Sequence, residues 1–487
     1  MHELMSAKLA TSMLALTLLG GCSLAPIYER PASPVAQAWP TGPSYKPAAA
    51  AAVPAADILW RDFFADDKLR GVVALALDNN RDLRVATLNI EKARAQYGIR
   101  RAGLFPQISL DASESATRTP ASLSPIPTGD ARVTRQYSVG LGAAAYELDF
   151  FGRVRNLSEA AMQLYLGTED GRRTAQISLV AEVAGNYLTL IADQERLILA
   201  QETFKSQQVS YELSQRRFNS GVTSGLNMYE AQTSVEAARS DVALYTSAVA
   251  LDLNALTLVV GAAVPESLLP SGPTGALVTL TEIPVGLPSD LLQRRPDVRA
   301  AERTLRAANA NIGAARAAFF PSISLTGSAG SASNDLSGLF KSGSSTWSFM
   351  PQIKLPIFDG GLNRANLTIA KVDRDISVAE YEKSIEVAFR EVSDALAQRG
   401  TLDQRLTSQE VLVEASTKGY RIYEARYRQG ADSYLNALIS QRALYAAQQN
   451  LISVRLLKST NLVTLYKVLG GGWQQETAAL ASAEGNR

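Results

Sequence analysis

The sequence contains the same long pattern twice. Residues 82–110 align with residues 297–325 at a constant offset of 215, and a later block aligns at an offset of 209. The clearest matches are Asp82 with Asp297, Arg101 with Arg316, Phe105-Pro106 with Phe320-Pro321, Gly221 with Gly430, and Leu226 with Leu435. A period above about 200 residues is far longer than the roughly 20–50 residues of a solenoid unit. Each half is therefore expected to be a complete structural unit, and the fold must accommodate two of them.

Each half contains a very long stretch with helical periodicity and no proline, at about residues 154–218 and 362–428. At ~1.5 Å per residue, each stretch would extend roughly 95 to 100 Å. Both end at a glycine, Gly221 or Gly430, and return helices are expected from near Leu226 and Leu435. A seven-residue apolar repeat predicts left-handed supercoiling against a neighbour; it comprises Val183, Leu190, Leu197, Phe204, Tyr211 and Phe218. Each half therefore has a long antiparallel helical hairpin.

Shorter helices at residues 69–105 and 290–320 are expected to stop at Pro106 and Pro321. Alternating apolar and polar residues then predict two β-hairpins, at residues 107–149 and 322–357. The expected apolar faces consist of Ile108, Leu110, Ala112, Tyr137, Val139, Leu141, Ala143 and Ala145 in the first hairpin, and of Ile323, Leu325, Gly327, Trp347, Phe349, Ile353 and Leu355 in the second. The connecting loops are rich in Pro, Ser, Gly and Asn, so the hairpins are expected to have polar tips.

Four amphipathic strands cannot close a membrane barrel alone. Outer-membrane barrels begin at about eight strands, and unpaired backbone groups in lipid cost several kcal/mol each. Two copies would supply eight strands, and a barrel of about that size is filled by its own side chains. Three copies, with four strands per chain, predict a trimeric 12-stranded β-barrel, continued by a long periplasmic α-helical barrel. The simpler alternatives are that the strands form the edge of a soluble β-sandwich and that the helices form a structural coiled coil.

The first 22 residues predict export to the cell envelope. Lys8 precedes an apolar run that ends at Leu19 and is followed by Gly20-Gly21-Cys22. The run is too short for a permanent membrane helix and has the layout of a cleavable signal. Small residues before a cysteine resemble the bacterial lipoprotein signal, in which the thiol is acylated, and Ser23 does not favour inner-membrane retention. The alternative is an ordinary secretory signal. No later segment reaches the ~20 continuous apolar residues of a membrane helix.

Two residue types are almost missing. The only histidine is His2 and the only cysteine is Cys22, so zinc sites, Ser/His/Asp or Cys/His catalysis and redox pairs lack their side chains. We therefore expect no enzyme, cofactor or metal site, although chemistry based on carboxylates alone stays formally open. The formal net charge of +1 gives no reason to expect a nucleic-acid partner.

These signals predict an order of segments along the chain. The expected map comprises a signal peptide at 1–22, a Pro/Ala-rich tether at 23–57, a first repeat at 58–261 with its helical hairpin at 154–260, a linker or belt at 262–289, a second repeat at 290–470 with its helical hairpin at 362–469, and a tail at 471–487.

Several motifs carry a family resemblance over essentially all of residues 22–473. They are Arg294-Arg295-Pro296-Asp297-Val298-Arg299, Ala317-Ala318-Phe319-Phe320-Pro321-Ser322, Trp60-Arg61-Asp62-Phe63-Phe64, Tyr427-Arg428-Gln429-Gly430 and Phe358-Asp359-Gly360-Gly361. The chain resembles outer-membrane factors of the TolC/OprM type, in the NodT-like lipoprotein branch. The resemblance implies an outer-membrane homotrimer that is lipid-anchored at Cys22 and extends into the periplasm. It also implies a passive conduit for drugs or toxic compounds, which works with a periplasmic adaptor and an inner-membrane pump.

The same resemblance points to the tips of the helical hairpins as the functional site. The adaptor-docking positions would be Gly221, Ser224, Leu226, Gly430, Ser433 and Leu435, and the periplasmic gate would comprise Asp432, Tyr427 and Arg428. The glycines are also expected to end helices. Three copies of Asp432 would form an acidic ring that selects cations, whereas the alternative is a solvated turn aspartate. Asn227 and Asn436 stand where many relatives carry an acid, which puts a salt-bridge lock there in doubt.

Two rival functions stay open from the sequence. The same conduit could serve protein or polysaccharide secretion, and the neighbouring genes would discriminate. A surface-anchored coiled-coil scaffold or adhesin would have no lumen and would show no conductance in planar bilayers.

Overall fold

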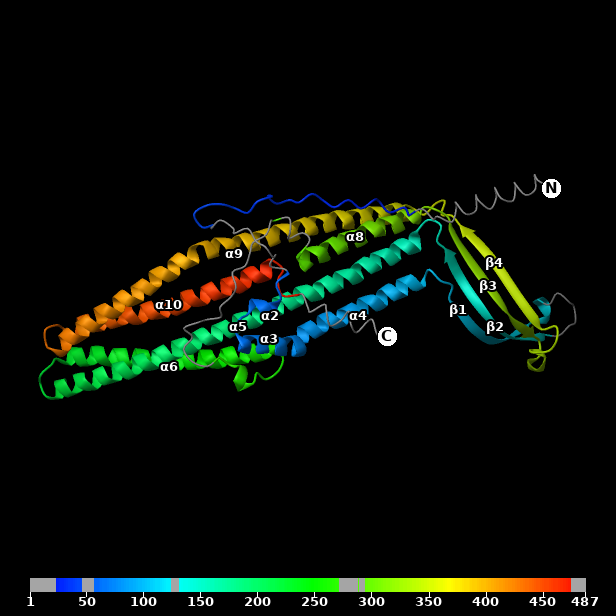
Figure 1. Cartoon of the computed structure of the whole chain (residues 1–487). Helices are drawn as coiled ribbons and strands as arrows, with labels where there is room; N and C mark the ends of the chain where they lie inside the picture. Colours follow the sequence, from blue (N-terminus) through cyan, green and yellow to red (C-terminus); the bar gives the residue numbers. More distant parts are fainter. Residues whose placement is uncertain (1–22, 46–56, 124–130, 271–287, 289–293, 474–487) are drawn as a thin grey trace. The chain divides into compact units, whose positions relative to one another are not determined.

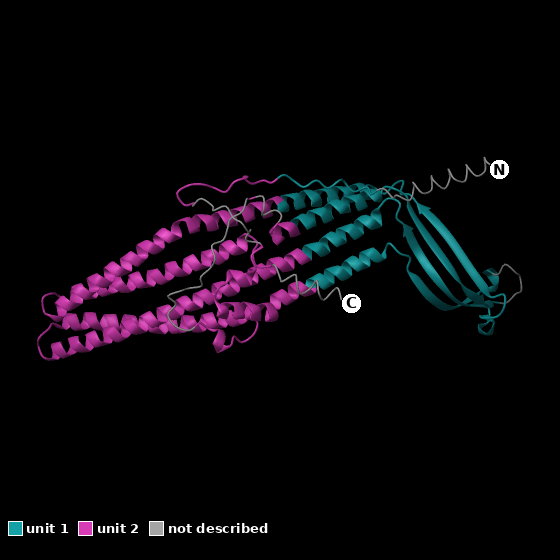
Figure 2. Ribbon diagram, in the orientation of Figure 1, with its two compact units in different colours: residues 1–32, 89–168, 301–381 teal, residues 33–88, 169–300, 382–487 magenta. Residues whose placement is uncertain are grey.

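The computed structural model describes residues 23–45, 57–123, 131–270, 288 and 294–473 (Figure 1). The predicted signal peptide with Cys22, most of the linker at 262–289 and most of the tail at 471–487 lie outside these residues. The chain divides into two compact units (Figure 2). Unit 1 comprises residues 1–32, 89–168 and 301–381, and unit 2 comprises residues 33–88, 169–300 and 382–487.

Unit 1 contains a four-stranded antiparallel sheet in the order β1-β2-β3-β4. The strands are β1 Ile108–Thr119, β2 Arg132–Leu148, β3 Ser322–Ser333 and β4 Ser345–Lys354. Each predicted β-hairpin is present, and pairing of β2 with β3 joins the two repeats into one sheet. The outer edges of β1 and β4 have no strand partner within the described part of the chain.

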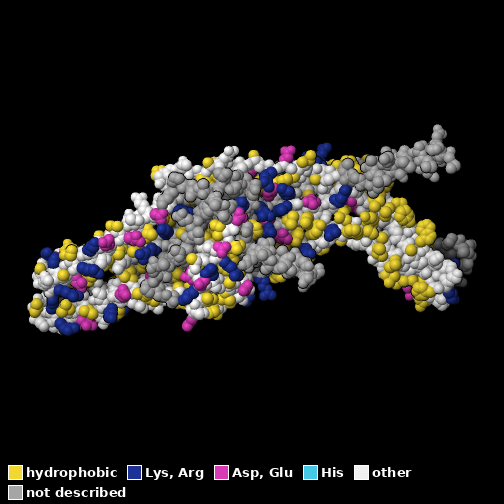
Figure 3. All heavy atoms as spheres, viewed as in Figure 1, with side chains coloured by type: hydrophobic (Ala, Val, Ile, Leu, Met, Phe, Trp, Pro, Cys, Tyr) yellow, Lys and Arg dark blue, Asp and Glu magenta, His cyan; other side chains and the backbone are white. Residues whose placement is uncertain are grey.

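The strand register places the predicted apolar residues on one face. Leu110 lies opposite Leu141, and Ile323 lies opposite Ile353, so apolar side chains meet across the strands. A register shift between Ala143 and Tyr146 interrupts the alternation, and Ala145 has a φ of 48°. The prediction that Ala145 continues this face is wrong, because the extra residue of the bulge moves Tyr146 into its place opposite Leu325. Figure 3 shows apolar side chains gathered over the strands.

The first predicted helix, 69–105, is two helices. They are α3 Asp67–Asn79 and α4 Arg81–Ala102, separated by Asn80 in an extended conformation. The Asn80 side chain accepts a hydrogen bond from the Leu83 N–H at 2.8 Å, as an N-cap does, and its amide donates to the Val259 carbonyl at 2.7 Å. A capping asparagine thus starts a new helix where apolar periodicity alone suggested continuation. In the second repeat, the corresponding helix is α8 Pro296–Ala317.

Two long helical hairpins follow the predicted bounds closely. They are α5 Arg153–Asn219 with α6 Gly225–Val260, and α9 Leu362–Arg428 with α10 Tyr434–Val468. In unit 2, Val183 and Leu190 of the predicted heptad are fully buried. The Trp60 motif forms the short helix α2 Trp60–Phe63, in which Trp60 and Phe63 are buried. Phe63 stacks on Tyr466 with ring centroids 4.0 Å apart. Within the described residues, α5 and α6 also meet a test of length and composition for membrane helices, a test that core helices of soluble proteins meet as well.

The segment expected to be a simple tether makes specific contacts. In unit 1, Arg30 forms an ion pair with Glu302 at 2.9 Å, and Asn309 donates to the Pro26 carbonyl at 2.8 Å. A Cβ on Gly313 would lie 2.7 Å from the Ala25 nitrogen, so the absence of a side chain lets this segment lie directly on α8. Residues 23–32 are therefore bound to the helices rather than hanging from them.

Candidate functional site at the helical tips

Both helical hairpins turn through the same backbone geometry, which lies entirely in unit 2. Gly221 has a φ of +71° and Gly430 a φ of +76°, values that favour glycine over other residues. The N–H of Val222 donates to Arg217 and that of Ala431 donates to Arg426, each at 2.9 Å across five residues. These are Schellman endings, which satisfy the last carbonyl groups of α5 and α9. The predicted glycines therefore end the helices.

The second tip is braced by Asp432. Its carboxylate accepts hydrogen bonds from the Asn436 side chain at 2.7 Å and the Ser433 N–H at 2.8 Å, and it pairs with the Arg426 guanidinium at 3.1 Å. These hydrogen bonds and this cation lower the pKa of Asp432 below the usual aspartate value, so the carboxylate stays ionised at neutral pH. Asp432 therefore ties the end of α9 to the start of α10.

The first tip has a similar hydrogen bond between side chains, but an uncharged residue at the position of Asp432. Thr223 occupies the position equivalent to Asp432, and Asn227 donates to its hydroxyl at 2.8 Å. In both tips the side chain of an asparagine thus bonds to the side chain four residues before it. A salt bridge at these asparagine positions would need an acidic residue instead. The tips differ in capping as well, because Ser433 accepts from the Asn436 N–H at 3.4 Å whereas Ser224 makes no side-chain cap.

The other two predicted gate residues have different environments. Tyr427 packs against Tyr434 with ring centroids 5.2 Å apart, and the Arg217 guanidinium lies 5.2 Å from the centre of the Tyr427 ring. Arg428 is exposed and pairs with Glu424 at 2.6 Å, one helical turn away. Tyr427 thus helps to hold the two hairpins together at the tip, while Arg428 lies on the surface of its own helix.

All four long helices contribute to a small cluster beside the tips. Ala231 and Leu438 are buried in it, and Tyr211 packs against it. Further along, α6 and α10 are joined by hydrogen bonds from Arg442 to Ser234, from Tyr445 to Asp241 and from Tyr245 to Gln449, at 3.2, 2.9 and 3.2 Å. A neutral bond of this kind contributes about 1 kcal/mol net, and one with a charged partner such as Arg442 or Asp241 about 1.5–3 kcal/mol, since water can replace either partner. Contacts of this kind can separate without exposing a large apolar surface.

The tips expose apolar side chains at the predicted docking positions. Leu226 and Leu435 are exposed, and neighbouring Val222, Tyr229 and Ile439 are exposed as well. Solvent-facing apolar residues grouped at one end of a helix pair are typical of a protein-binding surface. The predicted docking residues therefore lie together on two adjacent turns.

Sequence reasoning missed the cations and the second aromatic residue of this site. Arg426 lies six residues before Asp432, on the other side of the turn, and Arg217 and Tyr434 contact Tyr427. The signal that could have revealed these contacts is the glycine at each helix end. A Schellman ending folds the last helical turn back towards the residues that follow the glycine. Applied to Gly430, that geometry pairs Arg426 with Asp432.

The structure combines a duplicated chain, an amphipathic sheet with two unpaired edges and two long helical hairpins with exposed tips. These features define a subunit of an outer-membrane channel. The family model described as outer membrane efflux protein matches residues 72–262 and 287–471. The chain belongs to this family.

Named relatives agree with that assignment. The antibiotic efflux pump outer membrane protein ArpC and the toluene efflux pump outer membrane protein TtgC, both from Pseudomonas putida, are each 50% identical over 473 residues, which is 97% of either chain. Among solved structures, the open state of the Neisseria gonorrhoeae MtrE outer membrane channel matches with a TM-score of 0.85 and 38% identity, covering 94% of this chain and all of MtrE. The chain is thus an outer-membrane efflux channel component, a passive conduit and not an enzyme.

Proposed function

We propose that three copies of this chain close one pore, with β4 of each copy paired to β1 of the next. The proposal rests on the two outer edges of the sheet, on β1 and β4, which have no strand partner in the described part of one chain. Edge backbone groups cannot stay unpaired in lipid, where each costs several kcal/mol. Three sheets of four strands give a twelve-stranded barrel, which leaves a lumen where an eight-stranded one is filled.

An unpartnered stripe on α6 supports the same assembly. Leu244, Leu251 and Leu258 are 58%, 63% and 79% exposed and recur every seven residues. At about 100° per residue, the three lie within roughly 40° of one another around the helix. The buried residues of α6, such as Val235 and Leu256, lie on the opposite side. A heptad of exposed leucines fits the helix of a neighbouring copy, as in a coiled coil.

The substitution Leu251→Asp tests this assembly. A carboxylate in the centre of an apolar helix contact must lose water without gaining a partner, so we expect the trimer to dissociate at lower temperature or lower detergent concentration. The matched control is Thr246→Asp, an exposed site about 140° around the same helix. Light scattering of both detergent-extracted variants measures the result. Equal stability of the two variants would rule out the leucine stripe as an interface.

The tips serve as the gate and the adaptor-docking surface in this proposal. In the resting state, Asp432, Tyr427 and Arg428 narrow the pore, and the exposed docking positions Gly221, Ser224, Leu226, Gly430, Ser433 and Leu435 meet a periplasmic adaptor coupled to an inner-membrane pump. The hydrogen bonds between α6 and α10 support opening, because they can exchange with water. The adaptor shifts the equilibrium only if it binds the open state more tightly. An acylated Cys22 anchors the chain in the outer membrane.

The substitution Asp432→Asn is expected to lower the cation selectivity of the single channel. Three ionised carboxylates around a narrow opening favour cations, and the amide removes that charge while keeping the size of the side chain. The reversal potential in a salt gradient across a planar bilayer measures the change. Thr223→Val at the equivalent position of the first tip removes the acceptor for Asn227 without changing charge. An unchanged reversal potential in Asp432→Asn would count against the acidic ring.

The solutes are small toxic molecules in this proposal. The relatives named for antibiotic and toluene efflux support this class, because they match the chain over nearly its whole length. Accumulation of an aromatic solvent and of an antibiotic in a deletion strain, with and without this chain restored, tests the class. We expect restoration to lower the accumulation of both.

A further inference from the structure

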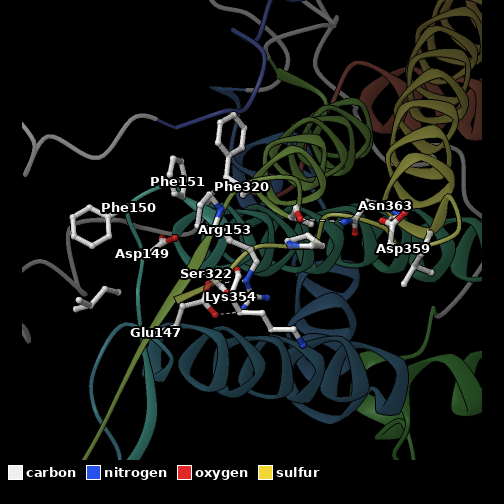
Figure 4. Close-up of a pocket in the computed structure, with 16 residues that line it drawn as sticks. Glu147, Asp149, Phe150, Phe151, Arg153, Phe320, Ser322, Lys354, Asp359 and Asn363 are labelled. Atoms are coloured by element: carbon white, nitrogen blue, oxygen red, sulfur yellow. Dashed lines mark hydrogen bonds and ion pairs between the residues drawn. The ribbon is translucent and has the colours of Figure 1, made fainter. Parts of the chain in front are cut away.

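Charged side chains mark the point in unit 1 where the sheet meets the helices and the membrane-facing apolar surface begins. Figure 4 shows Glu147, Asp149 and Arg153 around the junction of β2 with α5. Glu147 accepts a hydrogen bond from the Arg153 Nε at 2.9 Å, and Asp149 accepts one from the Arg155 N–H at 2.8 Å. Leu148, between the two acids, is the last residue of β2 and lies on the apolar face. The apolar band of β2 therefore starts at Leu148.

The same face of β2 changes character towards the other end of the strand. The residues on it there are Val139, Tyr137 and Arg135, which alternate with residues of the opposite face. From Leu148 to Tyr137, with one residue taken up by the bulge, the strand advances by roughly 33 Å, which is about 25 Å of height at the usual tilt of ~40°. The apolar band of an outer-membrane barrel is also about 25 Å tall and is flanked by aromatic residues. Tyr137 thus lies in the outer aromatic girdle, and Arg135 lies just outside the band.

A second arginine lies beside Arg135 on this face. Arg118 of β1 lies opposite Val133. Arg135 lies opposite Ala116, so the two arginines are diagonal neighbours across the strand pair. Diagonal positions are about 7–8 Å apart, within reach of two long side chains that converge on one group. Both arginines are exposed. The apolar face of the β1–β2 hairpin therefore carries a pair of guanidinium groups at its outer end.

Neither guanidinium has a hydrogen-bond or ion-pair partner among the residues that the structure describes. Glu114, the one acid of the β1–β2 pair on this face, accepts a hydrogen bond from the Tyr137 hydroxyl at 3.0 Å. The proposed barrel places β4 of a neighbouring copy beside β1, and β4 contains no acidic residue. The described residues of the outer end carry the cations Arg118, Arg132, Arg135 and Lys341 and the carboxylates Glu114 and Asp335. The outer end is therefore net positive, and it stays so when Asp130, outside the described residues, is counted.

We propose that Arg118 and Arg135 bind the phosphate group of a lipid in the outer leaflet of the membrane. The outer leaflet of a bacterial outer membrane consists largely of acylated sugars that carry phosphate groups. A guanidinium group matches a phosphate through two parallel N–H···O bonds, and clusters of basic residues at a membrane surface attract anionic headgroups. The acyl chains of the bound lipid lie against the apolar residues below, such as Val139. The lipid-facing placement rests on the proposed three-copy barrel, whereas the pair of arginines lies within one chain.

Native mass spectrometry of the detergent-extracted trimer, titrated with lipid, tests the site. The probes are a bisphosphorylated, hexa-acylated glucosamine disaccharide and the same lipid without its phosphates, both with EDTA so that metal ions form no bridges. The phosphorylated lipid is expected to bind about thirtyfold more tightly, because each basic residue near an anionic headgroup contributes a factor of about five. Arg118→Gln and Arg135→Gln should each weaken its binding about fivefold and leave the binding of the other lipid unchanged.

Arg132→Gln is the matched control. Arg132 is also exposed and lies at the same end of β2, but it lies opposite Thr119 on the face that lines the pore, so its loss removes the same charge without touching lipid. A trimer that binds the two lipids equally, or that loses as much affinity in Arg132→Gln as in Arg118→Gln, overturns the lipid site and leaves the proposed function standing.

Two further results would also overturn the lipid site. One is a soluble glucosamine phosphate that competes as strongly as the lipid, because the arginines would then bind phosphate without a membrane. The other is an Arg118→Gln variant that loses trimer but keeps its lipid affinity, because Arg118 would then contact a neighbouring copy. The same spectra record the mass of the assembly, and a chain that gives only single copies contradicts the proposed function itself.

Discussion

The substitution Gly330→Ala is expected to destabilise the membrane sheet by about 3 kcal/mol, near the upper end of the usual cost of overpacking. Gly330 of β3 lies opposite Gly140 of β2, at the seam between the two repeats. A Cβ at Gly330 would overlap the Val139 carbonyl oxygen and lie 2.5 Å from the Gly140 Cα. Both obstacles are backbone atoms, so the strands themselves must move apart. Thermal unfolding in detergent, together with the fraction of assembled channel in the outer membrane, measures the effect.

Gly142→Ala provides the matched control for this prediction. Gly142 lies on the neighbouring strand two residues from Gly140, so its Cβ would point to the same face. Nothing lies closer than 3.6 Å to that Cβ, and the substitution should be nearly neutral. If Gly330→Ala assembles and unfolds as Gly142→Ala does, the close approach of β2 and β3 is not a requirement of the sheet.

The substitution Arg295→Ala is expected to lower the free energy of unfolding by about 2–3 kcal/mol, the upper part of the range for hydrogen bonds to charged groups. Only 9% of the Arg295 side chain is exposed. Its guanidinium contacts Asp297 at 2.6 Å, Glu391 at 2.8 Å and the Val468 carbonyl at 3.0 Å, so it joins α8, α9 and α10 within unit 2. Removing it leaves two carboxylates and a carbonyl without their shared donor. Chemical denaturation followed by tryptophan fluorescence measures the loss.

The adjacent Arg294→Ala is the control. Arg294 pairs with Asp57 at 2.6 Å, and both side chains are more than one third exposed. An exposed pair of this kind contributes about 0–1 kcal/mol. Equal destabilisation by the two substitutions would show that Arg295 is not the buried link between the three helices.

The long elements could be predicted because their signals are regular and local. A seven-residue apolar repeat without proline located α5 to within a residue at each end, Arg153–Asn219 against the expected 154–218. Strict alternation likewise located the strands and their apolar face, including Leu110 opposite Leu141. The sequence could not show the bulge at Ala145, because a single inserted residue leaves the composition of a strand unchanged.

Contacts between distant residues were the part that the sequence could not provide. The gate prediction named Asp432 but not Arg426, because the two meet only after the Gly430 turn has formed. The segment at residues 23–32 has no periodicity, so nothing in it predicted the ion pair of Arg30 with Glu302.

Native mass spectrometry of the detergent-extracted chain tests most directly whether the open sheet of one copy is completed by others. An assembly mass equal to three chains, with no substantial population of single chains, is the expected result. A stable single chain that still conducts ions would contradict the account, because four strands with two bare edges would then suffice for a pore.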